Sequence, residues 1–154
     1  MSAAATEACA GCGAIVPRSD GPTHEYIGAS PGCWAIFGEV SARGTAVDQL
    51  RVDAYAAQHP GVPSRRSIQS VAVHLISLCL QLEHGATPAR AREAIIAALA
   101  MAYRFVWLDP PSFEGALTII DVAAGADVRA WAESVWRAWA PHHDTVRAWL
   151  SALS

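Results

Sequence analysis

The sequence predicts an all-α fold, a single-domain helical bundle preceded by an irregular loop with the residues of a zinc knuckle. The most periodic segment, residues 64–83, carries apolar side chains at alternating spacings of four and three residues, the period of one helix face. These side chains are Ile68, Ala72, Leu75, Cys79 and Leu82. Proline and glycine separate further segments of helical length, and no segment keeps the period-two alternation of a strand. We therefore expect helices, with residues 64–83 at the centre.

Start and stop signals predict two helices before the central one. Ser30 and Pro31 supply an N-cap and a proline at the first helical position, which predicts a helix over residues 31–41. Thr45 caps a second helix that runs through residue 58. Pro60 ends it, because proline cannot extend the hydrogen-bond ladder.

The second half of the chain predicts further helices. Thr87 caps a helix that extends to about Val106. Residues 118–124 form a short helix, and a tryptophan-rich helix follows Asp127. Pro141 interrupts this helix, and the last helix begins beyond it.

Size and composition bound the class of protein. A chain of 154 residues with 53% hydrophobic and 16% charged residues fits one compact domain rather than a disordered chain. The formal charge of −3 argues against a nucleic-acid partner, and no apolar run approaches the roughly 18–20 residues of a membrane span. Four cysteines without a secretory signal indicate reduced thiols in the cytoplasm. We expect a flexible tail over residues 1–8 and one helical domain over residues 9–154.

The strongest functional signal is a pair of cysteines near the N-terminus. Cys9 and Cys12, separated by two residues and followed by Gly13, form a knuckle of the kind that holds zinc. A redox dithiol would sit on a strand-to-helix turn, which the sequence does not indicate. Cys33 opens the helix over residues 31–41, where the helix dipole favours a thiolate. We expect Zn²⁺ bound by these three thiols, with residues 9–30 as a metal-binding loop packed on the bundle.

The fourth zinc ligand follows from the arrangement of the first two helices. If they form an antiparallel hairpin, Cys33 at the start of one and His59 at the end of the other lie at the same end of the bundle. His59 is therefore the first candidate and His24 the second. A water molecule in the fourth position would instead leave the site open for catalysis.

Other polar residues predict a pocket beside the metal. The polar segment around His24 and Tyr26 lies between metal ligands, which is typical of the lip of a site. His74 projects from the middle of the central helix, either as a core histidine or as a general base. Of the adjacent His142 and His143, only one can face inward. We expect a small-molecule pocket whose candidate catalytic residues are His24, His74 and His143, lined also by Tyr26 and Tyr55.

Several stretches together resemble a known family. They are Cys12-Gly-Ala, Asp20-Gly-Pro-Thr-His24, Ser30-Pro-Gly-Cys33-Trp34, Val52-Asp-Ala-Tyr55-Ala-Ala-Gln-His59-Pro-Gly61, Gln69-Ser-Val-Ala-Val-His74-Leu75 and the closing tryptophan-rich segment with His143. They cover nearly the whole chain, which resembles a family of bacterial proteins of about this length that is known only as a domain of unknown function. The resemblance implies no activity, substrate or cofactor.

Three functional hypotheses follow. The first is a small cytosolic helical zinc protein with a histidine-lined pocket beside the metal. If it is an enzyme, it is of the hydrolase or lyase type: the metal acts as a Lewis acid or activates water, and a histidine acts as base. The second is a binding or regulatory module whose zinc is purely structural. The third places the metal among His59, His74 and His143 in the bundle. Three protein ligands plus water would favour catalysis, and four protein ligands would favour the structural role.

Overall fold

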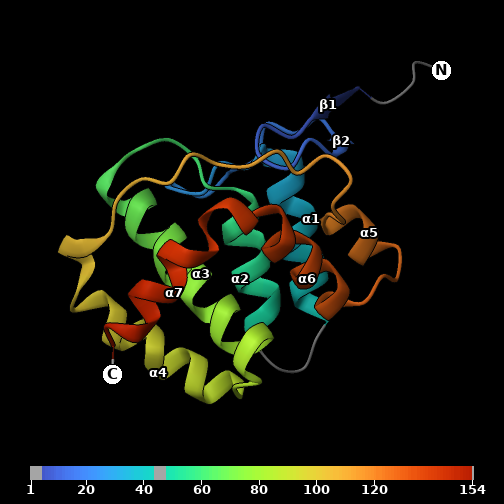
Figure 1. Ribbon diagram of the computed structural model, residues 1–154. Helices are drawn as coiled ribbons and strands as arrows, with labels where there is room; N and C mark the ends of the chain where they lie inside the picture. Colours follow the sequence, from blue (N-terminus) through green and yellow to red (C-terminus); the bar gives the residue numbers. More distant parts are fainter. Residues whose placement is uncertain (1–4, 44–47, 154) are drawn as a thin grey trace.

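The computed structural model describes residues 5–43 and 48–153, and most of this chain is helical (Figure 1). The prediction of a mostly helical protein is thus confirmed. The longer helices are α1 (Pro31–Arg43), α2 (Gln49–Gln58), α3 (Arg65–His84), α4 (Pro88–Leu99), α6 (Val128–Ala138) and α7 (His143–Ser151). Shorter elements are α5 (Ile119–Ala123) and the 3₁₀ turns η1 (Ala102–Arg104) and η2 (Ala140–His142).

A small antiparallel hairpin precedes the helices. Strand β1 (Thr6–Ala8) pairs with β2 (Ile15–Pro17), with Glu7 opposite Val16. The structure thus places a strand, β1, within the segment predicted as a tail, while residues 1–4 lie outside the described residues. The physical reason is the cysteine turn between the strands, which reverses the chain and brings the two segments into register.

The helix boundaries follow local capping with small departures from the prediction. The Asp48 side chain caps α2 by accepting a bond from the amide of Leu50 at 3.1 Å, whereas the expected cap Thr45 lies outside the described residues. Gly85, at φ 65°, ends α3 in the left-handed conformation. Helix α4 ends at Leu99 rather than near Val106, and η1 then leads into an irregular segment.

Helix α3 is the central helix, as its periodicity predicts. It packs against α2, α4, α6 and α7. The middle of its apolar stripe, Ala72, Leu75 and Cys79, is buried, and Ile68 and Leu82 at its ends are partly buried. Helices α6 and α2 are joined by two indoles, because the Nε1 atoms of Trp131 and Trp139 donate to Gln58 Oε1 and the Ala57 carbonyl, each at 3.0 Å. These bonds hold the end of α2, where His59 follows.

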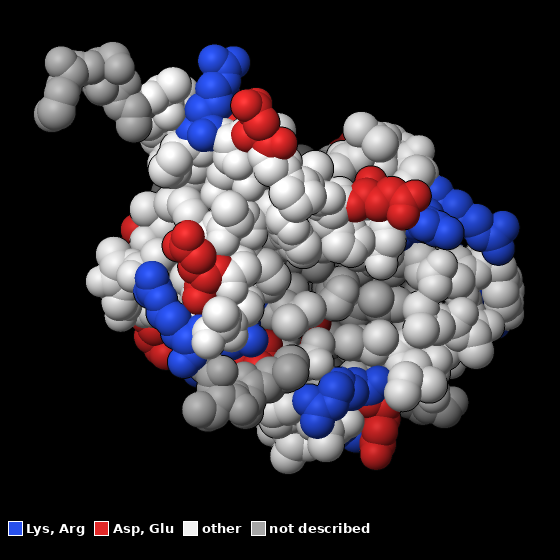
Figure 2. Space-filling model, turned by 180° about the vertical axis from the view of Figure 1, so that it is seen from behind, with Lys and Arg blue, Asp and Glu red and all other residues white. Residues whose placement is uncertain are grey.

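The surface shows no dominant sign of charge on the face seen in Figure 2. Acidic and basic side chains are interspersed there around a central hollow. Within the described chain, no helix combines the length and the hydropathy that a bilayer crossing requires.

Candidate metal centre

Four potential metal ligands meet where the β hairpin packs on the helices. Cys9, Cys12, Cys33 and His59 each offer one donor atom, and these atoms all lie within 4.8 Å of one another. All four residues are buried, with at most 8% of any of them exposed. Three segments of the chain thus converge on one point, and they supply three sulfur donors and one nitrogen donor.

The hairpin turn places the first two thiols. The amide of Cys9 donates to the carbonyl of Ala14 at 2.8 Å, and the amide of Gly13 donates to the Cys9 carbonyl at 3.0 Å. Gly13 has φ 77°, which favours glycine and closes the turn. The amide of Ala10 donates to Ser30 Oγ at 3.0 Å. The Ser30 hydroxyl therefore ties the turn to the start of α1.

Cys33 and His59 approach from the two helices, as the hairpin argument predicts. Cys33 lies in the first turn of α1, and His59 directly follows α2. The Sγ atom of Cys33 is 3.5 Å from Nε2 of His59. The His59 Nδ1–H donates to the carbonyl of Tyr55 at 2.7 Å, which directs the lone pair of Nε2 at the thiols. Metal-bound histidines commonly have this backbone partner on the second nitrogen.

Close backbone packing keeps the hairpin against His59. A Cβ atom at Gly11 would lie 2.5 Å from Cδ2 of His59 and 2.6 Å from the carbonyl oxygen of Gly28. A Cβ atom at Gly28 would lie 2.6 Å from the Cα atom of Gly61. Only glycine fits at these contacts, so the loop after α2, the segment before α1 and the cysteine turn form one packed unit.

The protonation of the cluster favours the binding of a cation. Hydrogen bonds from Cys12 and Cys33 hold the pKa of the Cys9 thiol far below its usual range, whereas hydrogen bonds to Cys12 and Cys9 raise the pKa of Cys33. Burial lowers the pKa of His59, but hydrogen bonds to Cys12 and Cys9 outweigh it and raise the value to about 9. Without a metal the cluster therefore retains protons that a divalent cation would displace.

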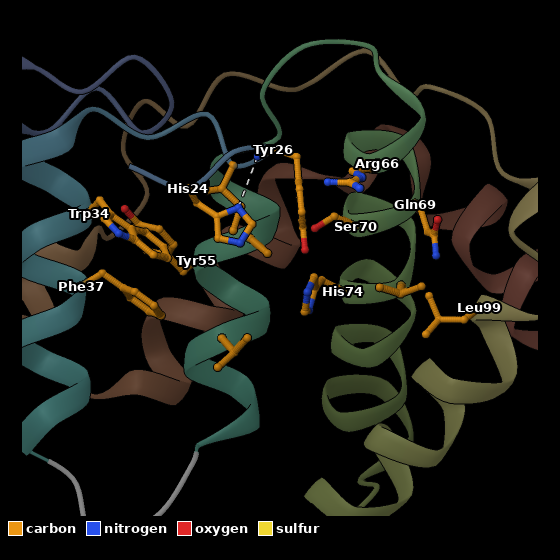
Figure 3. Close-up of a pocket in the computed structure, with 14 residues that line it drawn as sticks. His24, Tyr26, Trp34, Phe37, Tyr55, Arg66, Gln69, Ser70, His74 and Leu99 are labelled. Carbon is orange, nitrogen blue, oxygen red and sulfur yellow. Dashed lines mark hydrogen bonds between the residues drawn. The ribbon is translucent and has the colours of Figure 1, made fainter. Parts of the chain in front are cut away.

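Four of the five residues that we expect to line a pocket beside the metal do line one cavity. His24, Tyr26, Tyr55 and His74 line a cavity of about 520 Å³ between α1, α2 and α3 (Figure 3). His24 belongs to this cavity and not to the ligand cluster: its Nδ1 accepts the amide of Tyr26 at 3.3 Å, and its ring packs edge-on against Trp34.

His143 does not join the cavity. Its Nε2 lies 2.7 Å from the Trp136 carbonyl, to which it donates, and its ring stacks on the Trp136 indole at 3.8 Å. Among the described residues, the groups of potential ligands that lie close together do not unite His59, His74 and His143. The hypothesis of a three-histidine site thus has no support in the geometry.

The model of a family of unknown function, DUF5946, matches residues 7–140. The chain belongs to this family. No curated protein and no solved structure matches it significantly.

One residue of this DUF5946 protein that sequence reasoning missed is Asp53. Its fully buried carboxylate accepts a hydrogen bond from Nδ1 of His74 at 2.7 Å. A signal was present in the sequence, because the polar residues His74, Ser77 and Gln81 recur at spacings of three and four on the otherwise apolar central helix. Such a polar stripe on a buried helix needs a partner of its own, and Asp53 on α2 is that partner.

A second group of potential ligands lies at the other end of α3. Cys79, Glu83 and His84 have donor atoms within 4.8 Å of one another. Both oxygens of Glu83 already accept from the guanidinium of Arg147, at 2.9 and 2.8 Å. In this second group the Glu83 carboxylate is therefore part of a salt bridge beside the core thiol of Cys79. The cluster of Cys9, Cys12, Cys33 and His59 is the one with the donor atoms of a metal centre.

Proposed function

We propose that the protein binds one zinc ion at Cys9, Cys12, Cys33 and His59, and that this ion is structural and shapes an adjacent small-molecule cavity. The observation that carries the proposal is the convergence of four buried donors within 4.8 Å of one another. Three thiolates and one imidazole are a donor set typical of structural zinc, which prefers four ligands in a tetrahedron.

The number of protein ligands favours the structural role. A catalytic zinc keeps one position for water or substrate, whereas a structural zinc is enclosed by four side chains. Here His59 supplies the fourth donor, and the Cys33 and His59 side chains are almost wholly removed from solvent. Hydrolase or lyase chemistry at the metal would need an open position, so the closed set supports the second hypothesis over the first.

A zinc ion bound by these four residues would stabilise the fold by cross-linking separate segments of the chain. It would join the β hairpin, the start of α1 and the end of α2, which are distant in the sequence. Because the hairpin is too short to be stable alone, its position on the bundle would depend on the metal. Binding would require thiolates, and a reducing compartment such as the cytoplasm would keep the four free cysteines in that state.

Tyr55 links the metal centre to the cavity. Its ring stacks on His59 at 4.1 Å and on Phe37 at 4.0 Å, and it lines the cavity together with Phe37. The volume of about 520 Å³ and the mainly apolar lining with several aromatic rings are those of a site for a small organic molecule. In this proposal the metal therefore fixes one wall of a ligand site and takes no part in chemistry there.

The test is elemental analysis and X-ray absorption spectroscopy of the untagged protein purified under reducing conditions. We expect one zinc per chain, bound by three sulfurs and one nitrogen. A protein without bound metal would refute the proposal. An oxygen ligand in place of one protein donor would refute the structural role and restore the catalytic hypothesis.

A further inference from the structure

The starting point is a buried carboxylate with a complete set of donors. Asp53 Oδ1 accepts from Gln49 Nε2 at 2.9 Å and from His74 Nδ1 at 2.7 Å. Its Oδ2 accepts from Ser77 Oγ at 2.5 Å and from Gln81 Nε2 at 2.8 Å. Four donors thus hold the Asp53 carboxylate in the interior, and His74 is the one among them that can carry a positive charge.

The bond to Asp53 fixes the tautomer of His74. A carboxylate only accepts hydrogen bonds, so Nδ1 of His74 carries the proton and Nε2 of the neutral ring has a free lone pair. Within residues 5–43 and 48–153, no hydrogen-bond partner of Nε2 is found. The His74 side chain is 18% exposed and lies on the wall of the cavity (Figure 3). The buried network thus ends in a proton acceptor at the cavity.

The cavity has two different sides. Figure 3 shows the aromatic rings of Trp34, Phe37 and Tyr55 on the side of α1 and α2, facing His74 on α3 across the cavity. Ser70 and Tyr26 present hydroxyl groups on the same side as His74. A flat apolar molecule would lie against the aromatic side, and a polar group on its edge would meet His74.

The charges near the cavity favour a ligand that becomes an anion. The Asp53 carboxylate lies behind His74, from which it accepts a hydrogen bond, and is not among the residues that line the cavity. Arg66 stands at the rim and pairs with Glu25 at 3.1 Å, and both of those side chains are largely exposed. The polar side of the cavity therefore presents histidine, arginine and hydroxyl groups, which suit a negative ligand oxygen.

We propose that the cavity binds a flat, apolar small molecule with an acidic hydroxyl group, of the phenol class, and that Nε2 of His74 takes the hydroxyl proton. The O–H bond breaks and its electron pair stays on the ligand oxygen, while a new N–H bond forms on His74. The imidazolium then lies between the ligand anion and the Asp53 carboxylate, and each stabilises it. His74 is the binding group, and Asp53 is a positioning residue. This inference rests on the proposed role of the cavity as a small-molecule site.

The probe is 4-nitrophenol, whose phenol and phenolate forms absorb at different wavelengths. It is added to protein of measured zinc content at a pH at which the free probe is mostly the neutral phenol. We expect the bound probe to show the phenolate band. The matched probe 4-nitroanisole has the same ring but no proton to give. We expect it to bind about tenfold more weakly or worse, because it lacks a charge-assisted hydrogen bond.

Variants assign the proton acceptor. His74→Gln should abolish the phenolate band and reduce the affinity for 4-nitrophenol to that for 4-nitroanisole, with zinc content and circular dichroism unchanged. His84→Gln, an exposed histidine at the end of the same helix, should behave as the wild type. Asp53→Asn should weaken the band and replace the pure Nδ1–H tautomer of His74, seen by ¹⁵N NMR of the ring, by a mixture.

The wild-type spectrum decides the inference even if a variant fails to fold. A probe bound as the neutral phenol, a phenolate band that persists in His74→Gln, or no binding of either probe would each overturn it. Zinc content is measured on the same samples. The zinc content tests the proposed metal centre and the probe spectrum tests the proposed ligand, so the failure of one proposal can be told from the failure of the other. Zinc-bound protein without a phenolate band would leave the metal centre standing and remove the ligand class.

Discussion

The phenol hydroxyl of Tyr55 donates a hydrogen bond to Sγ of Cys33 at 3.2 Å. The carbonyl of the same residue accepts the Nδ1–H of His59 at 2.7 Å. Burial, together with the hydrogen bond to Cys33, raises the pKa of Tyr55 above its usual range, so the hydroxyl keeps its proton and remains a donor. One residue of α2 thus orients two of the four donors, one through its side chain and one through its backbone.

This relationship predicts the effect of Tyr55→Phe. The substitution removes the bond to the Cys33 sulfur but keeps the ring that stacks on His59 and Phe37. Loss of such an outer hydrogen bond should lower zinc affinity by about 10–100-fold while the protein stays folded. Competition with a chromophoric chelator measures the affinity. The matched control is Tyr103→Phe at an exposed tyrosine, and equal affinities in the two variants would contradict the prediction.

Removing a ligand should destabilise the whole fold. Cys12→Ser should abolish stoichiometric zinc binding and lower the free energy of unfolding by an amount on the order of several kcal/mol, because metal binding contributes folding energy. Thermal melts with and without a chelator measure this. The chelator should lower the melting temperature of the wild type and leave that of Cys12→Ser unchanged.

Cys79→Ser is the control for that experiment. Cys79 is also buried, but it lies on α3 away from the ligand cluster. Burial, with a contribution from Glu83, raises the pKa of Cys79 to about 12, so it stays a neutral thiol. We expect Cys79→Ser to keep one zinc per chain and its sensitivity to chelator. Loss of zinc from this variant would mean that thiol loss in general, and not ligand loss, explains the effect at Cys12.

Local signals predicted most of the helices and the convergence of the metal ligands. The cysteine spacing, the position of Cys33 in the first turn of a helix and the position of His59 after the next helix are all local in the sequence. Their meeting required only that α1 and α2 bring these two ends together. The strand over Thr6–Ala8 was missed because three residues are too few for a visible alternation, and its pairing depends on the turn beside it.

Predicting the cavity from the sequence would have required knowledge of contacts between residues that are far apart in the chain. His24 and Tyr26 belong to the expected pocket because they lie between metal ligands in the sequence, and His74 because it projects from the central helix. Together with Tyr55 they line the cavity. His143 was grouped with them only as a candidate that faces inward, and it faces Trp136 instead. The partner of His74 is Asp53, 21 positions away, and only the packing of α2 on α3 reveals it.

Two glycines of α1 provide a matched pair of substitutions. A Cβ atom at Gly32 would lie 1.9 Å from the carbonyl oxygen of Pro17, whereas a Cβ atom at Gly38 would meet nothing within 4 Å. Gly32→Ala should push β2 away from the helix and reduce stability by about 1–3 kcal/mol or more, with weaker zinc binding. Gly38→Ala should be neutral or stabilising by up to about 1 kcal/mol, because alanine favours helix. Urea denaturation compares them, and equal stabilities would show that the hairpin does not pack on α1 as described.

The salt bridge between α3 and α7 predicts a pH dependence of stability. Hydrogen bonds from Arg147, and a further bond from the Nε1 atom of Trp136 at 3.1 Å, lower the pKa of the Glu83 carboxyl in the folded protein. A carboxyl whose pKa is lowered by folding stabilises the protein above its unfolded pKa of about 4.3, and this contribution is lost as the pH falls through the lowered folded value.

Glu83→Gln should therefore destabilise the protein at neutral pH and have progressively less effect in acid. Glutamine keeps an oxygen that can accept from Trp136 but removes the negative charge that pairs with Arg147. Urea denaturation of both proteins at each pH measures the difference, and any metal lost in acid is lost from both. The control is Glu133→Gln, which breaks an exposed pair with Arg129 on α6 and should change stability little at any pH. If the difference in free energy of unfolding between the wild type and Glu83→Gln stays constant from neutral pH into acid, the charge of Glu83 contributes nothing to stability. A contribution from that charge must disappear in acid, because protonation of the carboxylate removes its pairing with Arg147.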